Sequence, residues 1–281
     1  MKILLTGANG QLGREIAIQL KNKEGTVLFP VDIDELDITD VRAVNRMIGD
    51  IEPDTVINCA AYTNVEKCEE DERTAAAVNS QGAGILAKAA FNAGASIIHL
   101  STDYIFDGKK QNPYTEEDEP NPINIYGLTK LEGEKAVKAE NPRHFIVRTA
   151  WLYGDGNNFV RTMLGCSKER DTIKVVDDQM GTPTSTAELA RAVIRLMDTK
   201  EYGIYHATCE GSCTWYEFAL KIFEIAGIPV KVNPCSSSEI IQKAKRPGYS
   251  VLENRNLRER LGYRFCSWQD ALKEYLKGEL S

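Results

Sequence analysis

The first half of the chain alternates between two kinds of segment. Short runs rich in β-branched residues, typical of buried strands, are separated by longer stretches whose apolar residues recur at helical spacing. The predicted strands are residues 2–6, 26–31, 55–59, 95–101 and 144–149, and the predicted helices are 11–22, 41–50, 71–92 and 126–140. Because right-handed crossovers join successive parallel strands, this order predicts an α/β fold with a doubly wound parallel sheet.

The pattern of predicted elements changes after residue 151, where short strands lie between helices. The predicted strands are 173–176 and 205–207, and the predicted helices are 188–197, 215–226 and 268–277. We expect residues 1–150 to form one domain, to which residues 184–207 return through the helix at 188–197. Residues 151–183 and 208–281 are expected to form a smaller C-terminal α/β domain.

Composition excludes several classes of protein. Apolar residues make up 42% of the 281 positions and charged residues 27%, which is ordinary globular usage and argues against disorder. The formal charge of −7 argues against a nucleic-acid partner. No apolar run approaches the roughly 18 residues that span a bilayer, and residues 1–5 are too short for a signal peptide. We therefore expect a cytoplasmic protein without a membrane partner.

The seven cysteines do not form a recognisable framework. Their number is odd, and no two are spaced as Cys-x-x-Cys, so neither structural disulfides nor a zinc site is expected. We interpret them as buried free thiols.

Charge is unevenly distributed along the chain. Residues 241–264 contain seven basic and two acidic side chains, which leaves a local charge of +5. This segment is either a solvated face or a pocket for an anionic substrate.

A glycine-rich loop follows the first predicted strand directly and opens the first predicted helix. It reads Thr6-Gly7-Ala8-Asn9-Gly10-Gln11-Leu12-Gly13. Glycines at these points permit a tight turn and a close approach of the backbone to a pyrophosphate, while the helix N-terminus supplies N–H donors. The next residues are Arg14 and Glu15, so the lysine and Ser/Thr of an NTPase loop are absent. This context predicts a dinucleotide site in a Rossmann-type domain.

Asp32 ends the second predicted strand, where an adenosine ribose would lie. Its carboxylate is expected to accept hydrogen bonds from the ribose hydroxyls and to repel a 2′-phosphate. Arg14, next to the loop, could instead attract that phosphate, so NADH and NADPH both remain open. The alternative for Asp32 is a turn or cap residue.

Tyr126 and Lys130 lie four residues apart at the start of a predicted helix, so they project from one face. A neighbouring ammonium is expected to lower the tyrosine pKa and make the phenol a usable general acid or base. The spacing alone is not specific. However, the fourth predicted strand ends in Ser101-Thr102-Asp103, at the same edge of the sheet as the glycine loop, and either hydroxyl could bind a substrate carbonyl.

These features together resemble the extended short-chain dehydrogenases/reductases. The motifs are Gly7-x-x-Gly10-x-x-Gly13, Asn58-x-Ala60-Ala61, Asn79, Ser101-Thr102-Asp103 and Tyr126-x-x-x-Lys130. A narrower set resembles the dTDP-4-dehydrorhamnose reductases nearly from end to end. It comprises Ser101-Thr102-Asp103-Tyr104-Ile105-Phe106-Asp107-Gly108, Arg148-Thr149-Ala150-Trp151-Leu152-Tyr153-Gly154, Asn157-Asn158-Phe159, Asp178-Gln179-Met180-Gly181-Thr182-Pro183-Thr184 and Arg246-Pro247.

The resemblance implies reduction of the 4-keto group of dTDP-6-deoxy-L-lyxo-4-hexulose to dTDP-L-rhamnose, with hydride from NADPH or NADH. By that pattern Tyr126 donates the proton to the C4 oxygen. Lys130 adjusts the pKa of Tyr126 and holds the nicotinamide ribose, and Thr102 helps to set the geometry of the proton transfer. The implied cofactor contacts, besides Tyr126 and Lys130, are Gly7, Asn9, Gly10, Gln11, Leu12, Gly13, Asp32, Asp37, Ile38, Ala60, Ala61, Tyr62 and Thr63. The implied substrate contacts are Thr102, Asp103, Trp151 and Arg246. Tyr62 departs from the family, whose members often carry histidine there.

The resemblance also suggests a Mg²⁺ site formed by carboxylates away from the chemistry. Glu15 and Glu188 could correspond to its ligands, but we favour the alternative that both are surface helix residues. We expect a small nucleotide sugar as the partner and leave a homodimer open. The 1–150 domain would bind the dinucleotide, and the C-terminal domain would bind the substrate.

Three other functions share parts of this pattern. Sugar-nucleotide 4,6-dehydratases carry the motif Thr-Asp-Glu at the position where this chain has Thr102-Asp103-Tyr104. The glutamate is missing here, which disfavours dehydration. A 4-epimerase or another 4-ketoreductase of nucleotide sugars shares the loop and the Tyr/Lys pair. A non-catalytic NADP-binding regulatory subunit, like the β subunit of methionine adenosyltransferase, would not need Thr102, Tyr126 and Lys130 together.

Overall fold

A six-stranded parallel sheet forms the centre of the computed structural model, which describes residues 1–21 and 23–279. Its order is β10-β5-β4-β3-β1-β2. The strands are β1 (Lys2–Thr6), β2 (Val27–Val31), β3 (Thr55–Asn58), β4 (Ser96–Thr102), β5 (His144–Thr149) and β10 (Gly203–His206). The order changes direction at β1, because β2 lies on one side of it and β3 on the other. The α/β fold with a Rossmann-type doubly wound sheet is therefore confirmed.

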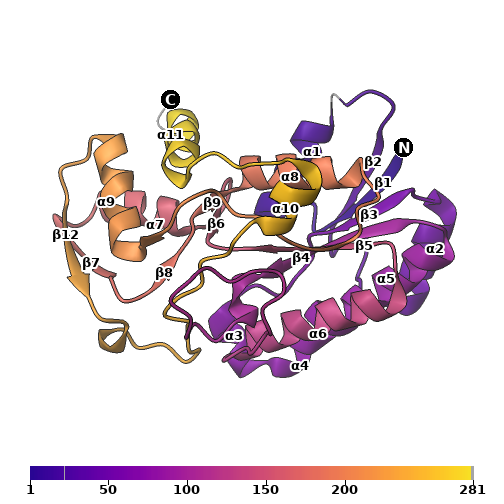
Figure 1. The fold of residues 1–281 in the computed structure, drawn as a ribbon, viewed down its shortest axis with the longest axis horizontal. Coiled ribbons are helices and arrows are strands. Elements are labelled where there is room, and N and C mark those ends of the chain that lie inside the picture. Colours follow the sequence, from indigo (N-terminus) through magenta and orange to yellow (C-terminus); the bar gives the residue numbers. More distant parts are fainter. Residues whose placement is uncertain (22, 280–281) are drawn as a thin grey trace.

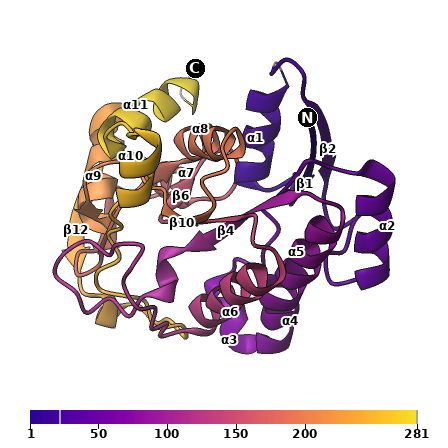
Figure 2. The ribbon, with the colours of Figure 1, turned by 45° about the vertical axis from the view of Figure 1, so that its right-hand side comes forward.

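Helices cover both faces of this sheet. The chain places α1 (Gln11–Leu20) and α8 (Thr186–Met197) on one face, and α2 (Val41–Ile51), α5 (Ala83–Asn92) and α6 (Ile125–Glu140) on the other (Figure 1 and Figure 2). Successive residues of a strand point to opposite faces, so Ile3 and Leu5 pack with α1 while Leu4 packs with α2 and α5. Each strand is buried on both sides, which explains its continuous apolar run.

Two predicted helices differ from those observed. The helix predicted at 11–22 ends at Leu20, and position 22 lies outside the described residues. The stretch predicted as one helix at 71–92 consists of α4 (Glu72–Ala76), the π-helical turn η1 (Ala77–Gly82) and α5, and the short α3 (Val65–Glu70) precedes it. Asp71 separates α3 from α4 because its side chain accepts a hydrogen bond from the Thr74 amide and caps α4.

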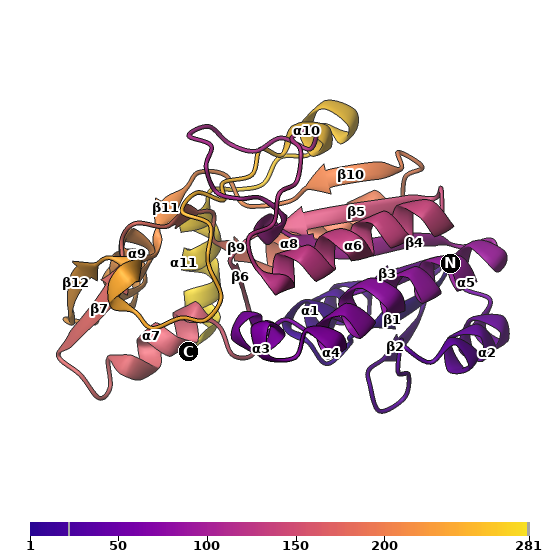
Figure 3. The ribbon, with the colours of Figure 1, turned by 90° about the horizontal axis from the view of Figure 1, so that it is seen from below.

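The C-terminal part contains short paired strands and helices at one end of the sheet (Figure 3). Three two-stranded pairs form here: β7 (Thr172–Val176) with β12 (Lys231–Cys235), β8 (Met180–Gly181) with β11 (Cys213–Thr214), and β6 (Leu152–Tyr153) with β9 (Thr184–Ser185). The helices are α7 (Phe159–Cys166), α9 (Trp215–Ala226), α10 (Arg255–Leu261) and α11 (Trp268–Glu279), and η3 (Ser237–Glu239) is a 3-10 turn. A further 3-10 turn, η2 (Asp103–Ile105), directly follows β4 in the first half of the chain. The sequence pattern missed β12, whose Pro234 is typical of an edge strand rather than of a buried one.

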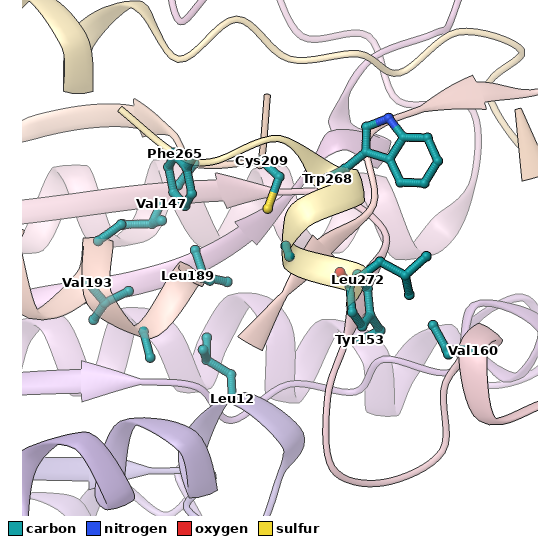
Figure 4. Close-up of a cluster of buried hydrophobic side chains, with 14 of the residues drawn as sticks. Leu12, Val147, Tyr153, Val160, Leu189, Val193, Cys209, Phe265, Trp268 and Leu272 are labelled. Carbon is teal, nitrogen blue, oxygen red and sulfur yellow. The ribbon is translucent and has the colours of Figure 1, made fainter. Parts of the chain in front are cut away.

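A continuous apolar core joins the C-terminal part to the sheet. In Figure 4, Leu12 of α1 and Leu189 of α8 lie in the same cluster as Tyr153, Trp268 and Leu272. The segment at 186–206 lies with the first half of the chain, because α8 packs on α1 and β10 pairs with β5 in the sheet.

The structure bears on two further expectations, one about the cysteines and one about membrane-spanning helices. All seven cysteines lie in the described residues and are free thiols, four of them buried and three half-buried. Within the described ranges, no helix has both the length and the apolar character needed to cross a membrane.

Candidate functional site

A cavity of about 900 Å³ opens at the carboxyl ends of β1, β3, β4 and β5. This is the edge at which open α/β sheets bind ligands, next to the point where the strand order changes direction. Of the residues named above as candidate cofactor, substrate or catalytic residues, all except Arg14 line the cavity: Gly7, Asn9, Gly10, Gln11, Leu12, Gly13, Asp32, Asp37, Ile38, Ala60, Ala61, Tyr62, Thr63, Thr102, Asp103, Tyr126, Lys130, Trp151 and Arg246.

The glycine loop leaves space that a side chain would fill. Gly7 has a φ of +68°, and a Cβ placed on it would lie 2.5 Å from the Ala60 amide nitrogen. A Cβ on Gly13 would overlap the Gly7 carbonyl oxygen, which lets α1 start directly against the loop. The resulting backbone cradle at the N-terminus of α1 fits the pyrophosphate of a dinucleotide.

Replacing Gly13 by alanine is expected to weaken binding of NADPH or NADH about tenfold or more, since the added methyl must displace the Gly7 carbonyl. The measurement is titration of the purified protein with each cofactor. Gly49→Ala is the matched control, because a Cβ at that helical glycine meets nothing within 4 Å. Equal cofactor affinities for the two variants would contradict the role of the loop.

Asp32 closes the loop from the end of β2. One carboxylate oxygen accepts from the Asn9 amide at 2.8 Å, and the other accepts from the Ile33 amide at 2.8 Å. Each oxygen has a second lone pair, so the Asp32 carboxylate stabilises this turn and can still accept a hydrogen bond from a ligand in the cavity that it lines.

Arg14 is engaged elsewhere. Its guanidinium donates to the carbonyl oxygens of Asn9 and Asp155 and forms an ion pair with the Asp155 carboxylate at 3.1 Å. It is not among the residues lining the cavity. The geometry therefore gives no support to Arg14 as the partner of a 2′-phosphate.

Tyr126 and Lys130 lie one turn apart in α6, beside the end of β4. The Asn124 side chain caps this helix by accepting from the Gly127 amide at 2.7 Å. Lys130 is buried, and its Nζ donates to the Leu100 carbonyl oxygen at 2.5 Å. Burial lowers the Lys130 pKa to about 8, although the Glu134 carboxylate acts in the opposite direction.

The pKa of Tyr126 moves in the direction opposite to the expected one. Burial raises it well above the ordinary value, and this effect outweighs a hydrogen bond with the Thr102 hydroxyl that lowers it. The expected lowering of the Tyr126 pKa is therefore not found in this structure, because burial dominates. The phenol is protonated at neutral pH, as it would be at its ordinary pKa of about 10.

Asp103 is a buried carboxyl beside these groups, with only 2% of its surface exposed. Burial raises its pKa to about 6, while hydrogen bonds from the Ser250 and Thr102 hydroxyls act to lower it. The Thr102 hydroxyl donates to Oδ1 at 3.0 Å.

Trp151 and Trp215 form a stacked pair in the cavity wall. Their ring centroids lie 3.5 Å apart with an angle of 7° between the planes, and both side chains line the cavity. Sequence reasoning missed Trp215, because nothing in the spacing of the two residues predicts that they meet.

Arg246 reaches the cavity from the segment that follows β12. Its Nη2 donates to the Glu66 carboxylate of α3 at 3.2 Å, and its Nε is buried without a partner among the described residues. Its guanidinium lines the cavity and is paired there with the Glu66 carboxylate.

Two buried polar networks support the site and were also missed from the sequence. Arg148 of β5 pairs with Glu134 of α6 at 2.7 Å, and the Ser101 hydroxyl donates to the same carboxylate at 2.5 Å. Asn79, in the π-helical turn, accepts from the Tyr62 amide at 2.8 Å and donates to the Tyr62 carbonyl oxygen at 3.1 Å. The turn therefore fixes the backbone that follows β3 at the edge of the cavity.

The residues suggested for Mg²⁺ do not fit a metal site. Glu15 accepts a hydrogen bond from Gln19, and Glu188 is paired with Arg191. Across residues 1–21 and 23–279, no three His, Cys, Asp or Glu side chains gather into a metal-binding group. Both glutamates are engaged within their own helices, and neither is a fully exposed surface residue, since the Glu188 side chain is only 13% exposed.

Comparison with known proteins identifies relatives over the whole chain. The model of the RmlD substrate binding domain matches residues 1–280. A dTDP-4-dehydrorhamnose reductase of Aggregatibacter actinomycetemcomitans is 39% identical, over 97% of this chain and 97% of its own. The crystal structure of a dTDP-4-dehydrorhamnose reductase from Clostridium acetobutylicum ATCC 824 is 54% identical, covers 100% of both chains and has a TM-score of 0.99.

A second solved structure has a bound nucleotide. The dTDP-4-dehydrorhamnose reductase from Bacillus anthracis str. Ames, in complex with NADP, is 42% identical over 99% of both chains, with a TM-score of 0.95. These matches, together with the cavity that gathers the motif residues, show that the chain belongs to the dTDP-4-dehydrorhamnose reductase family, the family of the RmlD substrate binding domain.

Proposed function

We propose that this chain reduces the 4-keto group of dTDP-6-deoxy-L-lyxo-4-hexulose to give dTDP-L-rhamnose, using NADPH or NADH. The observation that carries the proposal is the single cavity that holds the glycine loop, the Thr102/Tyr126/Lys130 group and Arg246 together. The relatives named dTDP-4-dehydrorhamnose reductase, one of them in complex with NADP, support the same reaction and cofactor class.

The glycine loop and Asp32 would hold the dinucleotide, with Lys130 at the nicotinamide ribose. When bound, the reduced nicotinamide supplies the hydride for C4 of the sugar. Tyr126 donates the proton to the C4 oxygen, and its raised pKa keeps the phenol protonated before the reaction. Thr102, whose hydroxyl donates to Asp103 at 3.0 Å in the structure, would redirect this donor to the substrate carbonyl and so orient it beside that phenol.

We assign the two tasks to different parts of the chain. Residues 1–150 and 184–207 would bind the dinucleotide, and residues 151–183 and 208–281 would bind the nucleotide sugar. Support comes from Trp151, Trp215 and Arg246, which reach the cavity from the C-terminal part. Arg246 would pair with the diphosphate, as a guanidinium prefers. A cytoplasmic location and a homodimer stay predictions.

The proposal is tested by mixing the purified protein with the enzymatically prepared 4-keto-L-sugar nucleotide and each reduced cofactor. We expect absorbance of the reduced nicotinamide to fall and dTDP-L-rhamnose to appear. No oxidation of either cofactor would refute the reductase and favour a cofactor-binding regulatory subunit. Interconversion of the two C4 epimers of a 4-hydroxy dTDP-6-deoxyhexose, assayed separately and without net change in the cofactor, would indicate an epimerase.

Replacing Lys130 by methionine is expected to weaken both cofactor binding and turnover. Because burial lowers its pKa to about 8, the ammonium loses its proton as the pH rises through that value. The wild-type enzyme should therefore lose cofactor affinity above about pH 8, and the variant should lack this limb of the profile. The control is Lys135→Met, which removes an exposed lysine from the same helix. An unchanged pH profile in Lys130→Met would count against the role of Lys130.

A further inference from the structure

The stacked indoles of Trp151 and Trp215 come from parts of the chain that are far apart in sequence. Trp151 follows β5, whereas Trp215 is the first residue of α9. Their rings overlap face to face at 3.5 Å, which is closer than any other aromatic pair found among the described residues. Because both also line the cavity, the pair forms one aromatic wall.

Trp151 has a backbone conformation that must be stabilised by its surroundings. Its φ of +46° lies in the left-handed region, which is unfavourable for a bulky residue and persists only where neighbours over-determine it. The Trp151 carbonyl oxygen accepts from the Thr184 amide at 3.2 Å. Gly181 packs so closely against the indole that a Cβ there would lie 2.6 Å from its Nε1. Trp215 covers the face of the ring.

The position of Trp215 is fixed by contacts of its own helix and of a neighbouring one. Thr214, the residue before it, caps α9: its amide donates to Glu217 at 2.8 Å and its hydroxyl accepts from the Glu217 amide at 3.2 Å. The same hydroxyl donates to Asp177 at 2.7 Å. Phe159, on α7, has its ring centroid 4.6 Å from that of Trp215. The indole is therefore fixed by its own helix and supported by a second one.

We propose that Trp215 is a positioning residue for the sugar. By stacking on Trp151, it keeps that residue in its left-handed backbone conformation, and the 6-deoxyhexose lies against the Trp151 indole. This rests on the proposed function. An indole face suits the C–H bonds of a sugar ring, and a 6-deoxy sugar presents a methyl group where other hexoses carry a hydroxyl. Without Trp215, Trp151 can relax out of its left-handed conformation, and the wall is lost.

The test compares Trp215→Ala, Trp215→Phe and Trp268→Phe with the wild-type enzyme. Trp268 is the remaining tryptophan; it is buried in the C-terminal core and does not line the cavity. We expect Trp215→Ala to raise KM for the nucleotide sugar about tenfold, with cofactor affinity unchanged, and Trp215→Phe to restore most of the loss. Trp268→Phe should leave KM as in the wild type.

A spectroscopic readout tests the geometry separately from activity. Two stacked indoles couple their strong far-ultraviolet transitions, so the wild type and Trp268→Phe should show a paired band in far-ultraviolet circular dichroism that both Trp215 variants lack. An active wild type with an unchanged KM in Trp215→Ala would overturn the inference alone. Parallel loss of cofactor affinity and thermal stability in Trp215→Ala would also overturn it, by showing a general structural role. An inactive wild type would remove the proposed function and this inference together.

Discussion

Replacing Tyr126 by phenylalanine is expected to lower turnover about a hundredfold or more, the usual scale for a positioned general acid, and to leave cofactor affinity near that of the wild type. The phenol is removed while the ring remains, so its edge-to-face contact with Tyr104, with ring centroids 5.9 Å apart, is kept. Single-turnover oxidation of the reduced cofactor by the keto sugar, followed by absorbance, measures the loss.

Tyr104→Phe is the control for Tyr126→Phe, because it removes a buried phenol from the neighbouring ring. We expect its effect on turnover to stay below about tenfold, since no proton transfer is assigned to it. Near-normal turnover in Tyr126→Phe, or an equal loss in both variants, would refute Tyr126 as the proton donor.

Replacing Arg148 by methionine is expected to destabilise the fold by about 3–5 kcal/mol, the range for removing one partner of a buried ion pair. The Arg148 and Glu134 side chains are only 3% and 4% exposed, so the variant would leave the Glu134 charge buried without its partner. Urea denaturation followed by circular dichroism gives the change in the free energy of unfolding.

Two further variants complete the Arg148 experiment. The double variant Arg148→Met with Glu134→Met should recover much of the lost stability, because no unpaired charge remains. Lys221→Met, which breaks an exposed pair with Glu224, should change stability by less than about 1 kcal/mol. A single Arg148→Met variant as stable as Lys221→Met would show that the buried pair is not needed.

The features that the sequence predicted well depend on neighbours along the chain. Gly7, Gly10 and Gly13 are close together between a strand and a helix, and Tyr126 and Lys130 are one helical turn apart, so their geometry follows from local structure. The parallel order of the sheet then brings the ends of β1 and β4 to one edge. For this reason the glycine loop and the Tyr126/Lys130 pair could be proposed from the sequence, whereas the other cofactor contacts and the choice of Thr102 came from the family resemblance.

The electrostatics of the same residues could not be predicted this way. Spacing placed Lys130 beside Tyr126, but the direction of the Tyr126 pKa shift is set by burial. Burial is a property of everything that packs around α6. The sequence pattern contains no measure of it at one side chain.

The sequence by itself determined the α/β fold through its periodicity and strand order. It predicted the dinucleotide loop from its position between a strand and a helix, and it predicted the Thr102, Tyr126 and Lys130 group through the resemblance to a known family. Only the tertiary structure decided that Trp215 stacks on Trp151, and that Glu134 pairs with Arg148 under the site. These contacts join segments that meet only once the apolar core has closed, and side-chain packing across that core, rather than periodicity, selects them.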